Sequence, residues 1–473
     1  MTEQEFAAPG QDDRASWAGR RVLVLGAGIS GIAAARALSR LGAHVLVADD
    51  RRDLLPQDLT SDNSSATASV VEIGMPNVLP DVSLVLASPG VAPSHHLLVA
   101  AGERGVDVIS EPELAWRLQD PGAPPWLIVT GTNGKTTTVG MLESILLAAG
   151  RACIATGNIG LPLVDVVDGP VRYDVLAVEL SSFQLFRSPS IRAHAAAVLN
   201  VAPDHLDWHG SMEAYARAKR VAFDHAGIAV FNRDDAESSR LAEHHQRPVG
   251  FTLGPPPLGA LGVVEGALVD RAFGEGLELA RVADLPIAGQ HNVANALAAA
   301  GLARSVSVDP SAVAQGLHTY LPGPHRNALV GTVGGVAYVD DSKATNPHAA
   351  KASLSAYSEV VWIAGGLLKG AQVDELVIAV RDRLRAVIVL GADRALIAHA
   401  LARHAPEVPV VDVASNDDGA MFEVVRAAAA QARPGSTVLL APAAASMDMF
   451  ENYVARAEAF ARAVSELRED GAR

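Results

Sequence analysis

The chain has 473 residues, a length that predicts about three domains. Hydrophobic residues make up 49% and charged residues 19%, which excludes a mainly disordered chain. Aromatic residues are only 4%, and with 38 basic and 53 acidic side chains the net charge is −15, which disfavours partners such as nucleic acid or an anionic membrane.

The N-terminal residues 1–19 lack the basic and apolar regions of a secretory signal, so they are predicted to be a flexible lead-in. No apolar stretch approaches the ~18 residues of a membrane span. Cys153 is the only cysteine, which excludes an intramolecular disulfide and a cysteine-rich metal site. We therefore expect a cytoplasmic protein without membrane insertion.

The first regular pattern is a strand, a glycine turn, a helix and a second strand. Arg21–Leu25 and His44–Ala48 are the strands, Gly26–Gly31 reads G-x-G-x-x-G, and Asp49 ends the second strand. The glycines let the backbone approach a diphosphate at a helix N-terminus, whatever nucleoside it carries. NAD, FAD and UDP-sugars all remain open at this point.

The rest of the first domain, predicted as residues 20–123, carries fewer signals. Thr60–Ser69 has no hydrophobic period and is predicted to be a surface loop without an assignable function. The strand Ser83–Ala87 runs into the turn Ser88-Pro89-Gly90. Asp120–Pro125 is rich in Pro and Gly, which predicts a domain boundary.

The second domain, predicted as residues 124–323, opens with the strand Trp126–Thr130 and the loop Gly131–Thr137. The backbone N–H groups of such a loop hold the β- and γ-phosphates of a nucleoside triphosphate. Lys135 neutralises the phosphates and the Thr136 hydroxyl reaches Mg²⁺. Val129 stands where the usual P-loop has Gly, so the loop is a shorter variant.

Later elements complete an α/β pattern. Strands are predicted at Val175–Leu180 and Ala195–Asn200, and helices at Met212–Phe223 and His291–Arg304. Beyond the break at residues 321–324, short apolar strands alternate with helices, which predicts a third domain at 324–473. The fold class is α/β with a Rossmann-like N-terminal domain, a central P-loop ATPase-type domain and a Rossmann-like C-terminal domain.

The sequence resembles the Mur ligase family of ATP-dependent amide-forming enzymes over nearly all residues past Gly19. The motifs that carry this resemblance are Gly131–Thr136, Gly157–Gly160, Glu179–Leu185, Asn200 with Asp204–Asp207, Tyr215 with Lys219, His291–Ala296, and His325 with Arg326. In the third domain, Asp341–Asn346 is similar to the signature of members that add D-glutamate to UDP-N-acetylmuramoyl-L-alanine.

The resemblance implies a reaction and its participants. ATP phosphorylates the carboxylate of the UDP-linked substrate, and the amine of D-glutamate attacks the acyl phosphate to give an amide, ADP and phosphate. The expected cofactors are ATP, two Mg²⁺ ions and a carbamate formed from CO₂ on Lys219. Both substrates are small molecules, and we expect a monomer.

The resemblance also assigns site residues. Expected at ATP are Gly131, Thr132, Asn133, Gly134, Lys135, Thr136, Thr137, Asn292, Asn295, Arg326 and Asp341. Expected at the UDP-linked substrate are Ser30, Asp49, Arg51, Ser88, Asn158 and His205. Expected at D-glutamate are Lys343, Thr345, Lys369, Ser446 and Tyr453. Expected at metal are Thr136, Glu179, His205 and Lys219 as its carbamate, and the catalytic set is Lys135, His205, Lys219 and Lys343.

The chain departs from the family pattern in two places. Asp50 replaces a common Thr beside Arg51, and Leu367-Leu368 replaces an Asp-Gly pair before Lys369. Without the resemblance, the local sequence would predict that Lys219 is a solvated helix residue. Carbamylation of Lys219 requires a neutral amine, and burial favours the neutral form because it lowers the pKa of a lysine.

Three other functions compete with this interpretation. An NAD-dependent oxidoreductase explains Gly26–Gly31 and Asp49 but leaves Gly131–Thr137 without a purpose. A GTP switch protein usually carries an Asn-Lys-x-Asp motif, which this sequence lacks. A related ligase for another amino acid, including folylpolyglutamate synthase, fits Asp341–Asn346 and the Rossmann-like first domain less well.

Overall fold

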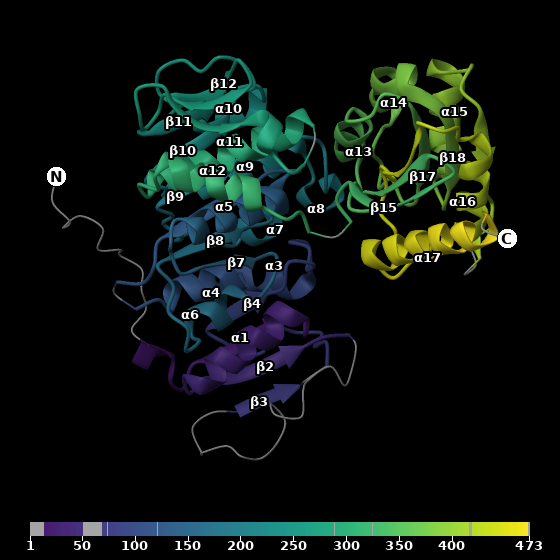
Figure 1. Cartoon of the computed structure of the whole chain (residues 1–473). Helices are drawn as coiled ribbons and strands as arrows, with labels where there is room; N and C mark the ends of the chain where they lie inside the picture. Colours follow the sequence, from purple (N-terminus) through teal and green to yellow (C-terminus); the bar gives the residue numbers. More distant parts are fainter. Residues whose placement is uncertain are drawn as a thin grey trace. The chain divides into compact units, whose positions relative to one another are not determined.

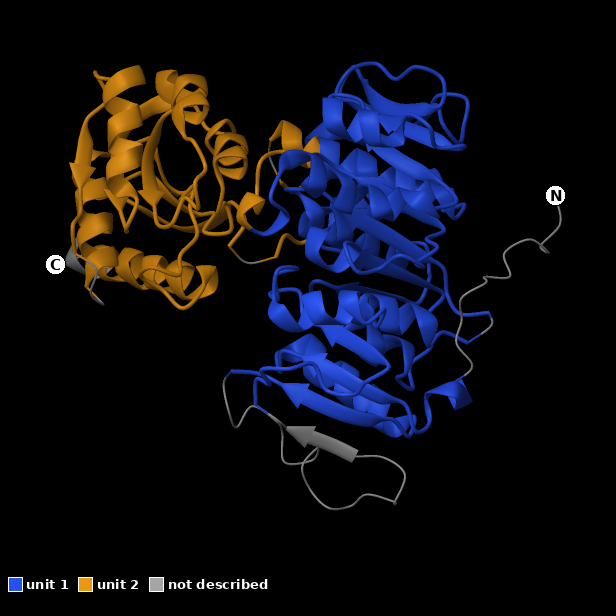
Figure 2. Ribbon diagram, turned by 180° about the vertical axis from the view of Figure 1, so that it is seen from behind, with its two compact units in different colours: residues 1–201, 208–284, 294–320 blue, residues 202–207, 285–293, 321–473 orange. Residues whose placement is uncertain are grey.

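The computed structural model describes residues 14–50, 69–72, 74–120, 122–287, 289–323, 325–415 and 419–471. Arg51 and most of the Thr60–Ser69 loop lie outside these ranges. The described residues form three sheets dominated by parallel pairs, which confirms the predicted three-domain α/β class. Figure 2 shows two compact units: residues 1–201, 208–284 and 294–320, and residues 202–207, 285–293 and 321–473.

The first sheet has the order β3-β2-β1-β4-β5, and all its strand pairs are parallel (Figure 1). Its strands are β1 (Arg21–Leu25), β2 (His44–Ala48), β3 (Ser69–Glu72), β4 (Leu84–Ala87) and β5 (Asp107–Ile109), with helices α1 (Ile29–Arg40), α3 (His96–Glu103) and α4 (Glu111–Arg117). β1 pairs with β2 on one side and with β4 on the other, so the strand order reverses direction at β1. The carboxyl end of β1 is therefore the topological switch point, where ligands bind in such sheets.

The segment before β1 is more ordered than a flexible lead-in. Arg14–Trp17 forms a 3₁₀-helix, and Trp17 is fully buried. Arg14 forms ion pairs with Asp120 and Asp168, and Asp168 also pairs with Arg40 of α1. The predicted flexibility of residues 1–19 is therefore wrong for residues 14–17, because one large apolar side chain and two ion pairs hold them on the fold.

The second sheet has the order β14-β13-β12-β11-β10-β9-β6-β8-β7. Its strands are β6 (Trp126–Thr130), β7 (Cys153–Gly157), β8 (Val175–Glu179), β9 (Ala195–Val198), β10 (Ala229–Asn232), β11 (Pro248–Phe251), β12 (Ala260–Val264), β13 (Ala267–Asp270) and β14 (Leu277–Arg281). Only β12–β13 and β13–β14 pair antiparallel. β6 is buried along its whole length between β8 and β9, so the loop that follows it is mounted on the centre of the sheet.

Helices alternate with these strands along the chain. They are α5 (Lys135–Ala148), α6 (Leu163–Val167), α7 (Ser182–Leu185), α8 (Leu206–His209), α9 (Met212–Asp224), α10 (Ala236–Ala242), η2 (Val282–Asp284), α11 (Gln290–Ser305) and α12 (Pro310–Thr319). Cys153, at the start of β7, is buried, and burial raises the pKa of its thiol to about 12. The thiolate is therefore a rare species at neutral pH.

The third sheet has the order β15-β16-β20-β17-β18-β19, and only β15–β16 is antiparallel. Its strands are β15 (Ala328–Val333), β16 (Val336–Asp340), β17 (Val360–Gly365), β18 (Leu384–Leu390), β19 (Val410–Asp412) and β20 (Thr437–Leu440). Its helices are α13 (Pro347–Leu354), α14 (Asp374–Val380), η3 (Arg381–Arg383), α15 (Arg394–His404), α16 (Ala420–Gln431) and α17 (Tyr453–Gly471). The alternation of parallel strands and helices confirms the doubly wound third segment.

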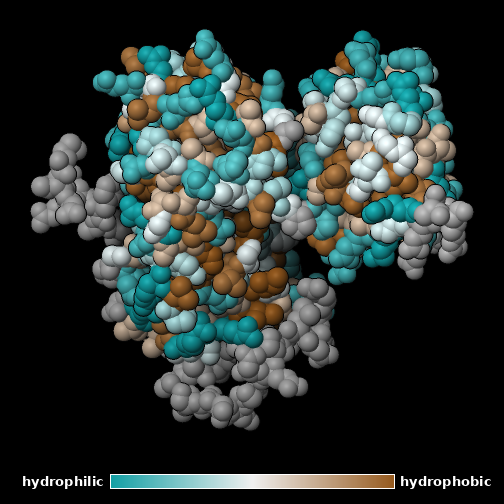
Figure 3. Space-filling model, viewed as in Figure 1, coloured by the Kyte–Doolittle hydropathy of each residue, from teal (hydrophilic) through white to brown (hydrophobic). Residues whose placement is uncertain are grey.

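Apolar side chains fill the layers between sheets and helices, and hydrophilic residues are interspersed with apolar ones over the face shown in Figure 3. Across the described ranges, no helix combines the length and the apolar character that crossing a bilayer requires.

Candidate active site

The loop after β6 closes on itself around Lys135. Its Nζ donates hydrogen bonds to the backbone oxygens of Gly131 and Thr132, both at 2.9 Å. Gly131 and Gly134 have φ values of 154° and 86°, in the region that favours glycine, and α5 begins immediately after Gly134. The result is a set of backbone N–H groups at the N-terminus of a 14-residue helix beside an ammonium group, which suits a phosphate.

Asn200, two residues after the end of β9, holds this loop in place. Its Oδ1 accepts from the Asn133 N–H at 2.9 Å, and its Nδ2 donates to the Asn133 oxygen at 3.1 Å. Thr132 is fixed through its hydroxyl, which lies 3.0 Å from that of Tyr215. The sequence motifs contain Asn200, but sequence reasoning gave it no role; the available signal was its place after a strand beside β6.

Asn295 of α11 packs against the same loop. A Cβ added at Gly134 would lie 2.4 Å from Asn295 Oδ1, so the loop and the amide are in close contact. Asn292 is also buried on α11. The structure thus brings Asn295 beside the loop that follows β6.

A buried carboxylate faces the start of α5. Glu179 ends β8 with 2% of its surface exposed. One of its oxygens accepts from the Thr136 hydroxyl at 2.7 Å and the other from Asn158 Nδ2 at 2.9 Å. No basic side chain forms an ion pair with Glu179 in the described part of the chain. A buried carboxylate with neutral partners calls for a cation.

These oxygen donors fit Mg²⁺, which prefers oxygen ligands and usually keeps several waters and substrate phosphates around it. Within the described ranges, no three His, Cys, Asp or Glu side chains come close enough to hold a metal by themselves. The chain's donors at this point are the Thr136 hydroxyl and the Glu179 carboxylate, so an ion here would share its coordination with phosphate oxygens.

Lys219 lies under the phosphate loop. It belongs to α9, it is 1% exposed, and its Nζ donates to the Gly131 oxygen at 2.8 Å. The ammonium group also lies 4.5 Å from the centroid of the Tyr215 ring. The local interpretation of a solvated helix lysine is therefore wrong, because the helix presents this residue to the loop rather than to water.

His205 lies in residues 202–207, which group with the third sheet. Its φ of 54° places a non-glycine residue in the left-handed region, where such residues are uncommon. Its Nε2 lies 3.6 Å from the Asp204 carboxylate, and Asp204 accepts a 3.5 Å hydrogen bond from Asn346. Strain of this kind is found at functional sites.

At the carboxyl edge of the first sheet, Asp49 and Ser88 meet the glycine turn. Asp49 accepts from the Ala27 N–H at 2.8 Å, and the Ser88 hydroxyl donates to the Gly26 oxygen at 3.1 Å. A Cβ on Gly31 would lie 2.0 Å from that same oxygen, which explains the last glycine of the motif. Ser30 is half-buried in the first turn of α1. Asn158 instead donates to the Glu179 carboxylate at the end of β8.

In the third domain, Asp341 follows β16 and is buried. Burial raises the pKa of its carboxyl to about 6. Hydrogen bonds from Ser353 and Asn327 and the positive charge of Arg326 lower this pKa, but by less than burial raises it. Next to it, His325 Nδ1 lies 2.7 Å from Asp340. Arg326 and Asp341 therefore share one end of the third sheet.

The expected D-glutamate residues come from several loops of the third domain. Lys343 Nζ lies 4.0 Å from the centroid of the Tyr453 ring, and Ser446 is buried. A bridge between Leu367 and Ala445 brings the Lys369 loop beside Ser446. The structure therefore clusters Lys343 with Tyr453, and the Lys369 loop with Ser446.

The Leu367-Leu368 departure is accommodated in this loop. Leu368 is buried in the core, and its N–H donates to Asp393 at 2.7 Å. Lys369 is exposed with a φ of 52°. The apolar pair thus anchors the turn that presents Lys369.

Sequence reasoning missed Arg456, which ties these loops together. It is 1% exposed and donates to the Ser342 hydroxyl at 3.0 Å, the Ser342 oxygen at 2.9 Å and the Ala444 oxygen at 3.1 Å. Burial lowers its pKa to about 10, so it stays charged. On the sequence it sits on an ordinary alanine-rich helix, which gives no signal of this role.

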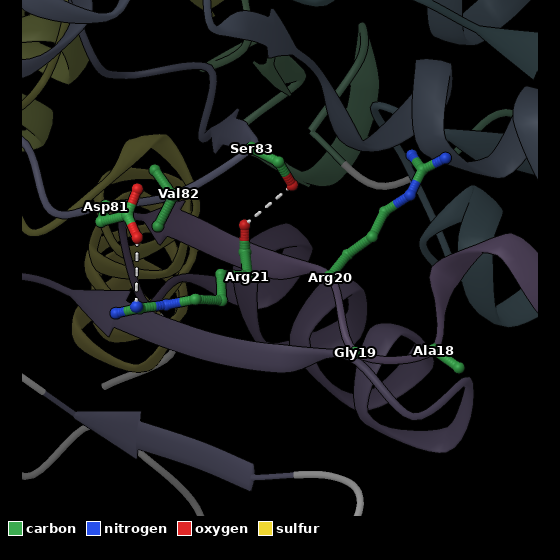
Figure 4. Close-up of a pocket in the computed structure, with 7 residues that line it drawn as sticks. All are labelled: Ala18, Gly19, Arg20, Arg21, Asp81, Val82 and Ser83. Atoms are coloured by element: carbon green, nitrogen blue, oxygen red, sulfur yellow. Dashed lines mark hydrogen bonds and ion pairs between the residues drawn. The ribbon is translucent and has the colours of Figure 1, made fainter.

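A hollow of about 430 Å³ lies elsewhere, at the amino ends of β1 and β4 (Figure 4). Arg21 pairs with Asp81 across it at 3.3 Å, and the Ser83 hydroxyl donates to the Arg21 oxygen at 3.2 Å. It opens at the edge opposite to Asp49 and Ser88, so it takes no part in the site.

Three family descriptions match the chain. Residues 20–110 match "Mur ligase MurD-like, N-terminal domain", residues 129–303 match "Mur ligase middle domain", and residues 325–444 match "Mur ligase, glutamate ligase domain".

Curated relatives match almost end to end. A protein of Thermobifida fusca named UDP-N-acetylmuramoylalanine–D-glutamate ligase is 56% identical over 95% of this chain and 99% of its own. A protein of the same name from Streptomyces avermitilis is 55% identical over 96% of this chain and 99% of its own.

Solved structures share the fold at low identity. UDP-N-acetylmuramate-alanine ligase MurC from Thermotoga maritima aligns with a TM-score of 0.58 at 17% identity, covering 95% of this chain and 100% of that one. MurF from Acinetobacter baumannii aligns with a TM-score of 0.60 at 19% identity, covering 90% and 91%.

Proposed function

The chain belongs to the Mur ligase family, and from that premise we propose that it joins D-glutamate to UDP-N-acetylmuramoyl-L-alanine with ATP, in the synthesis of peptidoglycan precursors. The observation that carries the proposal is the 56% identity to a ligase of that name along 95% of the chain. The Asp341–Asn346 signature, within the match to the glutamate ligase domain, points to the same amino acid.

The reaction must first activate a carboxylate. Its oxygen attacks the γ-phosphorus of ATP, giving an acyl phosphate and ADP. The amine of D-glutamate then attacks the carbonyl carbon, loses a proton and expels phosphate, which leaves an amide. Phosphorylation matters because oxide is a far poorer leaving group than phosphate.

Charge neutralisation is the main requirement of the first step, because two anions must approach each other. We assign this task to Lys135 and the loop N–H groups. Lys135 now bonds to Gly131 and Thr132, so it can exchange two neutral oxygens for charged phosphate oxygens. Thr136 and Glu179 would hold Mg²⁺, which would supply further positive charge to neutralise the phosphates.

We propose that Lys219 is carbamylated and that its carbamate, together with His205, would bind a second Mg²⁺. Its burial and its contact with the Gly131 oxygen support this role, since a buried amine is more readily neutral. Intact-mass measurement of the native protein should show one added CO₂, lost on acidification and absent from Lys219→Arg. An unmodified lysine in active enzyme would contradict the assignment.

The second substrate carries two carboxylates, and we assign its capture to Lys343, Lys369 and Ser446, with Thr345 and Tyr453 at the edge. Lys343 is oriented by the Tyr453 ring, 4.0 Å from its Nζ, and Ser342 is fixed by Arg456. We place Asp49, Ser88 and Ser30 at the UDP moiety, and Arg326 and Asp341 at ATP.

We also propose that the protein is a monomer and that it is cytoplasmic. Sedimentation analysis tests the oligomeric state, and cell fractionation tests the location.

The decisive experiment is ADP release with UDP-N-acetylmuramoyl-L-alanine and one amino acid at a time. D-Glutamate should stimulate release strongly, whereas L-glutamate and meso-diaminopimelate should not. Omission of the UDP-linked substrate gives the background. Equal stimulation by all amino acids, or none by D-glutamate, would overturn the assigned substrate.

A further inference from the structure

Arg187, just after α7, is a buried cation that the proposed mechanism does not use. It is 4% exposed, and burial lowers the pKa of its guanidinium to about 10. Among the described residues, no acidic side chain forms an ion pair with it. A buried charge without a counter-charge is costly, so its partners should explain its presence.

Those partners are backbone oxygens of another domain. Arg187 Nη2 donates to the Val91 oxygen at 2.8 Å, and Nη1 makes a longer bond of 3.4 Å to the Ser88 oxygen. The guanidinium carbon lies 5.5 Å from the centroid of the Trp208 ring, which adds a cation–π contact. One side chain from the second domain therefore holds both ends of a four-residue turn of the first domain.

This turn, residues 88–91, borders the glycine turn after β1. The Ser88 hydroxyl donates to the Gly26 oxygen, and the Val91 N–H donates to the Ser88 oxygen at 3.1 Å. A Cβ on Gly26 would lie 2.7 Å from Ser88 Oγ, so the two turns touch. A shift of the 88–91 turn would therefore move the wall of the site that receives the UDP moiety.

The backbone around Arg187 is itself fixed. The Ser110 N–H donates to the Arg187 oxygen at 3.0 Å, and the hydroxyls of Ser110 and Ser188 lie 2.7 Å apart. Upstream, Ser181 lies two residues after Glu179; it is the N-cap of α7 and forms a capping box with Gln184. Arg187 thus connects the 88–91 turn to the strand that carries the buried carboxylate, through a short rigid path.

We propose that Arg187 is a positioning residue for the nucleoside-diphosphate-sugar substrate. It sets the 88–91 turn relative to the end of β8, so that a substrate bound by its UDP moiety directs its L-alanine carboxylate towards the phosphate loop. The inference rests on the proposed function. A residue that only cross-links two domains would lower stability without selecting one substrate, whereas a positioning residue acts on this substrate alone.

The test compares Arg187→Gln, Arg187→Lys and the control Arg192→Gln, an exposed arginine five residues away. For Arg187→Gln we expect KM for UDP-N-acetylmuramoyl-L-alanine to rise about 10-fold or more. KM for ATP and for D-glutamate should stay within about twofold of the wild type. Lysine keeps the charge but lacks the fork that reaches two oxygens, so Arg187→Lys should recover part of the loss. Arg192→Gln should match the wild type.

Unchanged KM for the UDP-linked substrate, or an equal rise for all three substrates, would overturn the inference. If Arg187→Gln does not fold, Arg187→Lys decides by the same criterion: a selective rise in that KM supports the positioning role, and its absence refutes it. The wild type is assayed first, because failure of D-glutamate-dependent ADP release there would refute the proposed function instead.

Discussion

Glu179 is the carboxylate on which the metal proposal depends, and its hydrogen bonds come from a hydroxyl and an amide. Replacing it with Gln keeps the shape and removes the charge. We expect Glu179→Gln to raise the Mg²⁺ concentration for half-maximal activity about 10-fold or more. Titration of activity against Mg²⁺ measures this, with the exposed Glu213→Gln as control. Identical Mg²⁺ curves for the two variants would remove Glu179 from the metal site.

Asp341 offers a test of charge burial. Its folded-state pKa of about 6 exceeds the ordinary 3.8, so the folded protein binds the proton more tightly than the unfolded chain. The contribution of Asp341 to the free energy of unfolding is fully present below about pH 4 and is lost as the pH rises through about 6. We expect Asp341→Asn to gain stability relative to the wild type between pH 4 and pH 7, while losing ATP-dependent activity. Parallel stability curves across that range would contradict the stated pKa.

At the scale of single residues, sequence patterns predicted a set of site side chains but not their hydrogen bonds. Asp49 bonds to the glycine turn itself, and Asn158 turns to Glu179. Lys219 is buried although its neighbours Arg217 and Arg220 are exposed. These arrangements arise from tertiary packing, which a local pattern does not contain.

Among the elements, the turn between β6 and α5 has little steric freedom. Gly134→Ala would place a methyl group 2.4 Å from Asn295 Oδ1 in a left-handed conformation. We expect KM for ATP to rise about 10-fold or more, because the loop must shift away from its phosphate-binding shape. Gly150→Ala is the matched control: its φ is 73° and its added methyl meets nothing within 4 Å. The control should lose about 1 kcal/mol of stability and keep its KM for ATP. Equal KM values in both variants would contradict this prediction.

Strands were the elements that the sequence predicted best. β1, β2 and β6 begin and end at the predicted residues, because each is a short apolar run bounded by turn residues. The 3₁₀-helix Arg14–Trp17 escaped prediction, since four residues give no periodicity and its order depends on Trp17 and Asp168. The roles of Arg187 and Arg456 also escaped prediction, because most of their hydrogen-bond partners are backbone oxygens in other segments of the chain.

For the whole molecule, the contact between the first and second domains contains a buried acid. Glu111 accepts from the Val164 N–H at 2.6 Å, while its Oε2 is buried without a partner. Burial, reinforced by nearby Asp165, raises its pKa to about 8. Because the folded state then holds the proton more tightly than the unfolded chain, this group's contribution to stability falls as pH rises from about 4.5 to about 8.

Glu111→Gln should therefore be increasingly favoured over the wild type as pH rises. We expect the difference in Tm to grow by more than about 2 °C between pH 5 and pH 8.5, as thermal unfolding would measure. Glu113→Gln is the contrasting variant, because Glu113 pairs with Arg117 and bonds to Ser190, and its replacement should destabilise. A Tm difference for Glu111→Gln that does not vary with pH would show that Glu111 has an ordinary pKa.

Because Cys153 is buried, the natural chain can be used directly for site-specific labelling at an introduced cysteine. Maleimide reagents need an accessible thiolate, and this thiol is buried with a pKa of about 12. A cysteine introduced at an exposed position, such as Arg192 or Glu213, should therefore react alone. Fluorescent dyes or spin labels could then report domain motion during turnover without first removing the native cysteine.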